Sequence, residues 1–168
     1  MAAITAGMVK ELREMTGAGM MDCKKALNET NGNMEEAVEF LRKNGQAKAE
    51  KKASRIAAEG ICRIATKGDT VAAVVEVNSE TDFVAKNEMF QEYVAAVAEQ
   101  AVNSDAADMD AFLAEAWNLD ATKTVKEALV EKVAVIGENL NIRRFEKVEA
   151  ANGCVLSRDG LCQSVDGD

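Results

Sequence analysis

The 168-residue sequence contains no histidine and no proline. Without histidine, neither a Ser-His-Asp nor a Cys-His catalytic arrangement can be built, and the usual proton carrier at neutral pH is missing. Carboxylates and lysines remain as possible catalytic groups, but no motif gathers them around a pocket. The sequence therefore favours a binding protein over an enzyme.

Cysteines are few, and no two of them form a Cys-x-x-Cys pair; they are Cys23, Cys62, Cys154 and Cys162. With histidine absent as well, the commonest zinc-binding patterns are excluded. No apolar run approaches the roughly 20 residues of a membrane-spanning helix, and the first ten residues lack the features of a signal peptide. We expect a cytoplasmic protein with reduced thiols and without a metal or cofactor.

Acidic residues outnumber basic ones, 29 against 20, which gives a formal net charge of -9. This excess of negative charge repels nucleic-acid phosphates and anionic lipid surfaces. A basic stretch lies at residues 46–59, but it has no interleaved aromatic residues that could stack on bases. We therefore interpret it as a solvated helical linker, and expect no direct nucleic-acid or membrane partner.

Residues 1–45 carry three short helical patterns. The first two are expected to end at Gly17 and at Asn31-Gly32. The third begins at Asn33, with Glu36 three residues later as in a capping box, and is expected to stop at Asn44-Gly45. A bundle of this size is only marginally stable, so a docking module is more plausible than a catalytic pocket.

A mixed pattern of strands and helices fills residues 60–157. Ile61 to Ala65 and Val71 to Val77 are apolar and β-branched around a Lys67-Gly68-Asp69 turn, which predicts a hairpin. Helical spacing then recurs in three segments, on Phe90 to Ala101, on Phe112 to Trp117, and on Val125 to Ile136. Together these elements predict an α+β fold, a small antiparallel sheet packed with helices.

The last predicted strands are residues 142–149 and 154–156, with Asn152-Gly153 as a hairpin signal between them. The polar tail at residues 158–168 leaves the final strand little to pair with. We therefore expect an incomplete core.

Three segments resemble bacterial elongation factor Ts: Val9 to Leu27, Thr81 to Asn87, and Ile136 to Arg144. The resemblance covers roughly residues 2 to 157. It implies an amino-terminal three-helix domain of ubiquitin-associated type, a linker, and the first half of a core with an antiparallel sheet. The second half of the core, a coiled-coil insertion and a carboxy-terminal module have no counterpart in this sequence.

The resemblance implies a guanine-nucleotide exchange factor for elongation factor Tu, which does no bond chemistry. In the family, residues matching Thr81, Asp82, Phe83 and Val84 enter the G domain beside the nucleotide pocket, and magnesium is lost. The residues themselves are consistent with this, because Thr81 can cap a helix that the Asp82 charge favours. Phe83 in the first turn is either ordinary core or a ring that projects into a partner.

Four further residues match positions that lie against the partner in the family, namely Arg13, Met20, Met21 and Ile136, and Lys24 is a weaker candidate nearby. Without the resemblance, the two methionines would be interpreted as local core, and the two cations as solvated charges. Ile136 shares an apolar helical face with Val133, so core packing remains an alternative for it.

Two other functions stay open. The chain could be a docking fragment that binds the GTPase without efficient nucleotide exchange, because half of the core is missing. It could also be a small enzyme that uses Asp or Lys side chains, although no motif supports this. The sequence leaves the oligomeric state open.

Overall fold

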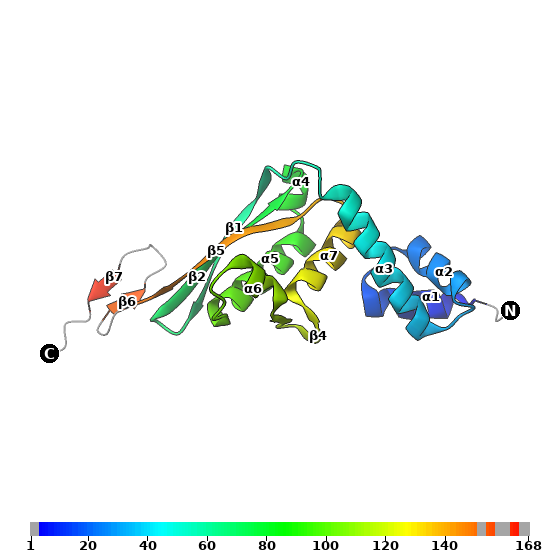
Figure 1. Ribbon diagram of the computed structural model, residues 1–168, viewed down its shortest axis with the longest axis horizontal. Coiled ribbons are helices and arrows are strands. Elements are labelled where there is room, and N and C mark those ends of the chain that lie inside the picture. The colour runs from blue at the N-terminus through cyan, green and yellow to red at the C-terminus, as the bar shows by residue number, and fades with distance from the viewer. Residues whose placement is uncertain (1–3, 151–153, 157–161, 165–168) are drawn as a thin grey trace. The chain divides into compact units, whose positions relative to one another are not determined.

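The structure, a computed structural model, describes residues 4–150, 154–156 and 162–164 (Figure 1). It divides into two compact units, which are described separately. The first comprises the chain up to Arg55 together with Val130–Asn139, and the second comprises Ile56–Leu129 and the chain from Leu140 onward. Helices and an antiparallel sheet are both present, which confirms the predicted α+β class.

The first unit is built on three helices, α1 (Ala6–Thr16), α2 (Met20–Glu29) and α3 (Met34–Lys52). Helix α1 ends at Gly17, which has a φ of 66° and so occupies the left-handed region that glycine adopts cheaply. At the start of α3, the Asn33 side chain accepts from the backbone N–H of Glu36 and donates to the Glu36 carboxylate at 3.0 Å. The N-cap predicted at Asn33 is confirmed, but the full capping box is not formed, because the backbone N–H of Asn33 donates to the carbonyl of Thr30 instead of to Glu36.

Helix α3 continues through Asn44 and Gly45 to Lys52, so the predicted stop at these two residues is wrong. Gly45 is buried, and a Cβ added to it would lie 3.4 Å from the Cβ of Ala134. This glycine therefore allows close packing and does not end the helix by a left-handed turn. The predicted helical character of residues 46–59 holds as far as Lys52.

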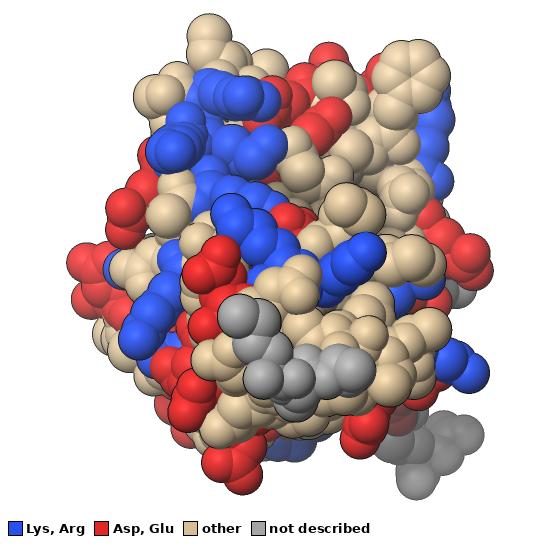
Figure 2. All heavy atoms as spheres, turned by 90° about the vertical axis from the view of Figure 1, so that its right-hand side faces the viewer, with Lys and Arg blue, Asp and Glu red and all other residues tan. Residues whose placement is uncertain are grey.

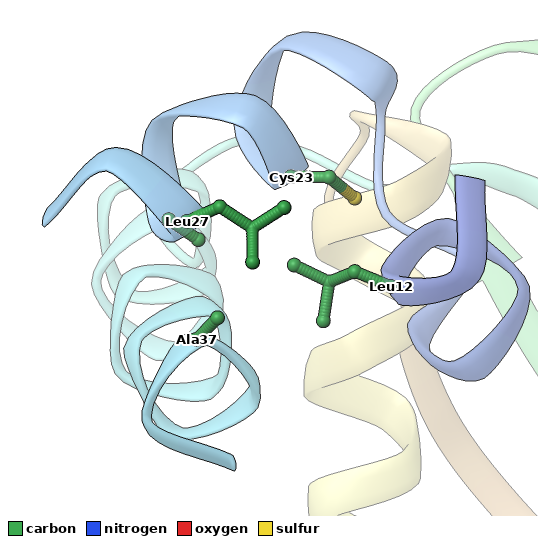
Figure 3. Close-up of a cluster of buried hydrophobic side chains, with 5 residues drawn as sticks. Leu12, Cys23, Leu27 and Ala37 are labelled. Carbon is green, nitrogen blue, oxygen red and sulfur yellow. The ribbon is translucent and has the colours of Figure 1, made fainter. Parts of the chain in front are cut away.

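Five fully buried residues form the core of the first unit: Leu12, Cys23, Ala26, Leu27 and Ala37. Figure 3 shows the side chains of Leu12, Leu27 and Ala37 directed from three different helices toward a common centre. Burial raises the pKa of the Cys23 thiol, so this cysteine serves as a small apolar side chain.

The second unit contains a three-stranded antiparallel sheet in the order β1-β2-β5. Its strands are β1 (Glu59–Lys67), β2 (Val71–Ser79) and β5 (Asn141–Glu149), so the predicted hairpin and the strand after it are confirmed. Helix α5 (Glu88–Asn103) contacts β1 and β2 (Figure 1) and buries Phe90, Val94 and Val97. The sheet residues Val75 and Val77 are also fully buried.

A short helix, α6 (Met109–Ala114), and a small hairpin of β3 (Ala116–Trp117) and β4 (Asp120–Thr124) follow α5. The prediction that Trp117 lies on a helix is wrong, because the backbone leaves α6 before it and pairs with β4. Its ring packs beside Tyr93 with 5.9 Å between ring centroids. A strand of two residues is too short to show the alternation that sequence reading depends on.

The predicted helix on Val125 to Ile136 is present as α7 (Val125–Ile136) and ends at Gly137, which has a φ of 86°. Near the carboxyl end, β6 (Cys154–Leu156) pairs with β7 (Cys162–Ser164). The expectation that residues 154–156 have little to pair with is therefore wrong, because the tail supplies a strand of its own. The Asn152-Gly153 turn lies outside the described residues.

No helix in the described part of the chain is both long and apolar enough to cross a membrane.

Candidate partner-binding site

The site begins where β2 ends and a single turn of helix, α4 (Asp82–Ala85), starts. Thr81 has extended backbone angles, and its hydroxyl accepts a hydrogen bond from the N–H of Val84 at 3.4 Å. This is the cap expected from the sequence, since a side-chain oxygen here satisfies one of the unpaired N–H groups of the first turn. The far end is anchored by Ala85, which is buried.

Phe83 lies on this turn with 81% of its surface exposed. The interpretation of Phe83 as ordinary core is therefore wrong, and the ring projects into solvent. Burying an aromatic ring of this kind against a partner would contribute about 2 to 3 kcal/mol. Val84, its neighbour, is half-buried, so the turn presents one exposed apolar side chain above a partly packed base.

Asp82 forms an ion pair with Lys86 one turn later, with 2.7 Å between its Oδ2 and the Lys86 Nζ. The hydrogen bond and the positive charge of Lys86 lower the pKa of the Asp82 carboxyl, and Asp82 correspondingly raises the pKa of Lys86. Both side chains are more than half exposed, so the pair adds little to stability. Its effect is to keep a charged carboxylate beside the projecting ring.

In the first unit, Met20 and Met21 are 60% and 75% exposed in the first turn of α2. The interpretation of these two methionines as local core is therefore wrong. Arg13 and Lys24 are also exposed, as solvated cations or partner contacts would be. A flexible and polarisable methionine surface suits an apolar contact that adapts to a partner.

Met15 is a further exposed apolar residue of the first unit, with 63% of its surface accessible. It is not among the nine residues selected from the sequence. Its spacing of three from the fully buried Leu12 is also the spacing of a core residue, so only the structure shows that it is exposed.

Charge on the surface is uneven despite the net negative total. On the face drawn in Figure 2, Lys and Arg side chains gather in a band, with Asp and Glu side chains mostly around it.

Ile136 is half-buried at the end of α7, three residues after the buried Val133. This placement is compatible with packing and with a partner contact. The fold therefore leaves both interpretations of Ile136 open, as it does for the exposed cations Arg13 and Lys24.

Within the described residues, no group of three or more cysteine, aspartate or glutamate side chains could hold a metal ion. The aspartates at 105 and 108 have structural partners. Asp108 caps α6 by accepting from the N–H of Ala111 at 2.8 Å, and Asp105 lies 3.3 Å from the Nζ of Lys147.

Comparison with known proteins places these features in a family. The sequence model of the family described as Elongation factor TS matches residues 80–158, a range that contains the whole exposed turn. Elongation factor Ts of Clostridium novyi is 56% identical over 153 residues, which cover 90% of this chain and 50% of that protein. Elongation factor Ts of Thioalkalivibrio sulfidiphilus is 56% identical over 171 aligned positions, covering 98% of this chain and 57% of that protein.

A third relative, elongation factor Ts of Methylobacterium radiotolerans, is 55% identical over 157 residues, covering 94% of this chain and 50% of that protein. The chain thus spans about half the length of the curated relatives that it matches. The resemblance predicted from the sequence is confirmed.

Proposed function

We propose, on the premise that this chain matches the elongation factor Ts family along most of its length, that it promotes GDP release from elongation factor Tu. The observation that carries the proposal is the exposure of Phe83 on a capped turn beside the charged Asp82. Such a turn is shaped to enter another protein, and nothing in it suggests chemistry on a bound substrate. The chain would act in the cytoplasm, as a binding protein.

The proposed mechanism starts from the strict geometry of magnesium sites. Magnesium requires near-ideal octahedral oxygen ligands, so a small displacement of the surrounding loop is enough to release it. The ring of Phe83 would enter an apolar recess of the G domain, and Asp82 would add negative charge close to the phosphates. Once the metal that neutralises the phosphate charge has left, GDP is held less tightly and dissociates faster.

The helical domain at residues 1–45 is proposed to supply docking. Met20 and Met21 would form its apolar contact, with Arg13 and Lys24 as charged neighbours at the rim. Ile136 is proposed as a further contact. Methionine side chains suit such a contact because they are flexible and polarisable and can pack against surfaces of different shape.

The test is release of fluorescently labelled GDP from purified elongation factor Tu, with and without the chain. Acceleration that rises with the concentration of the chain and saturates is the expected result. If the chain binds the GTPase measurably and yet leaves the release rate unchanged, the proposal is overturned.

A second candidate is a docking fragment that binds elongation factor Tu without efficient exchange. The observation that favours it is the coverage of only about half the length of the relatives. The substitution Phe83→Ala separates the two. Under the exchange proposal it should lower the rate at saturation at least tenfold and change binding less, because the ring would contribute its burial of about 2 kcal/mol mainly in the state from which GDP leaves. Under the docking proposal it should change little.

A further inference from the structure

The connection between β2 and the exposed turn contains a buried hydroxyl. Ser79 is the last residue of β2 and has none of its surface exposed. Its Oγ donates a hydrogen bond to the carbonyl oxygen of Thr81 at 3.0 Å. The side chain thus reaches forward from the sheet to Thr81, the residue that caps α4, a type of contact that short hydroxyl side chains make in turns.

The carbonyl of Thr81 has a second donor, the N–H of Ala85 at 3.3 Å. The carbonyl oxygen of Thr81 therefore accepts two hydrogen bonds: the one from Ser79, which we call the clamp, and the one from Ala85 that closes the helical turn. A helix of four residues cannot sustain itself in water, since nucleation costs more than one turn of hydrogen bonds returns. Contacts with the rest of the fold must therefore keep α4 helical.

The far end of α4 is held in a comparable way. The side chain of Gln91, on α5, donates to the carbonyl of Ala85 at 3.4 Å, and the N–H of Asn87 donates to the carbonyl of Val84 at 2.9 Å. Phe83 lies between these two points of attachment, fully outside the core. The turn is thus fixed to the sheet at its start and to α5 at its end.

We propose that Ser79 is a positioning residue for Phe83. Its hydroxyl fixes the peptide that joins Thr81 to Asp82, and so sets the direction in which the ring leaves the fold before a partner arrives. A contact segment ordered in advance avoids an entropy cost on binding. This inference rests on the proposed exchange function, but Ser79 itself would never touch elongation factor Tu.

The experiment is a double-mutant cycle on GDP release with Ser79→Ala, Phe83→Ala and the combination, all in the full 168-residue chain. Ser79→Ala should slow GDP release about fivefold, the change that corresponds to the net free energy of one hydrogen bond. In the Phe83→Ala background the same change should have no further effect, because Ser79 acts through the ring. Equal losses in both backgrounds would overturn the inference.

Ser104→Ala is the matched control. Ser104 is also buried, and its hydroxyl donates to the Glu115 carboxylate at 2.6 Å in the same unit. This variant removes a bond to a charged group and also the hydrogen bond that the hydroxyl accepts from the N–H of Ala106 at 3.0 Å, so it should lower stability at least as much as Ser79→Ala without slowing GDP release. If it slows release as much as Ser79→Ala does, a general loss of stability explains both, and the positioning role is wrong.

A local readout is amide hydrogen exchange at Ala85, whose N–H bonds the clamped carbonyl. Ser79→Ala should speed exchange at this amide about fivefold and leave the amide of Thr30, in the first unit, unchanged. Ser79→Cys, which keeps a donor at this position but a weaker one on a larger atom, should fall between. An unchanged Ala85 amide would overturn the inference.

Failure of the two proposals can be told apart. A wild-type chain that leaves GDP release unchanged overturns the proposed function, and with it any role of Ser79 in exchange. An active wild-type chain whose Ser79→Ala variant releases GDP at the normal rate overturns this inference alone.

Discussion

At the scale of single residues, the charge of Asp82 depends on its neighbour Lys86. The ion pair between them, 2.7 Å long, is the main cause that lowers the pKa of the Asp82 carboxyl. A carboxyl with a lowered pKa in the folded state contributes stability above its unfolded pKa of about 3.9, and loses it as the pH falls through the lower folded value. Near neutral pH the carboxylate is therefore always charged.

Lys86→Met should raise the pKa of Asp82 toward its ordinary value, because the hydrogen bond and the positive charge are both removed. The carboxyl carbon of Asp82, followed by NMR during an acid titration, measures this. Lys10→Met is the control, since Lys10 forms an exposed pair of the same spacing with Glu14 in the first unit. An Asp82 titration identical in Lys86→Met and wild type would show that the pair is absent in solution.

At the scale of elements, the start of β1 depends on a glycine. Gly60 has a φ of 137°, and a Cβ added there would lie 2.2 Å from the carbonyl oxygen of Val77. Gly68, in the turn between β1 and β2, also has a positive φ, of 61°, but an added Cβ would meet nothing within 4 Å. Both glycines therefore have a positive φ, but a side chain would clash with backbone atoms only at Gly60.

Gly60→Ala should lower the free energy of unfolding by at least about 3 kcal/mol, because a clash with backbone is added to the strain of positive φ. Gly68→Ala should cost only about 1 to 2 kcal/mol, the cost of a left-handed residue alone. Urea denaturation followed by the fluorescence of Trp117, which is buried in the same unit, compares the two. Equal losses would mean that the hairpin shifts to accommodate the side chain.

Helix α3 shows why the end of a helix can be mispredicted from the sequence. Asn44-Gly45 is a strong stop signal by local chemistry. It is overridden because Gly45 packs against Ala134, a residue far away in the sequence. By contrast, the N-cap at Asn33 and the turn at Gly17 depend on residues within one helical turn, and both predictions are correct.

At the scale of the whole molecule, the proposed exchange is a coupling between two ligands of one GTPase. If the chain weakens the binding of GDP by some factor, GDP must weaken the binding of the chain by the same factor. We expect the affinity of the chain for nucleotide-free elongation factor Tu to exceed its affinity for the GDP complex by the factor measured in the reverse experiment. Isothermal titration with and without saturating GDP and magnesium measures this, and equal affinities would contradict exchange.

The sequence by itself determined the family, the α+β class, the helix caps at Gly17, Asn33 and Thr81, and the β1-β2 hairpin. Each of these depends on residues close together along the chain or on long segments that match the family. It also selected Phe83, but it left open whether the ring was core or surface. Only the tertiary structure decided that, since exposure depends on what the rest of the fold brings near a side chain. The same holds for the clamp from Ser79: a serine at a strand end has no sequence signature, and its role follows from burial and from the carbonyl that its hydroxyl reaches.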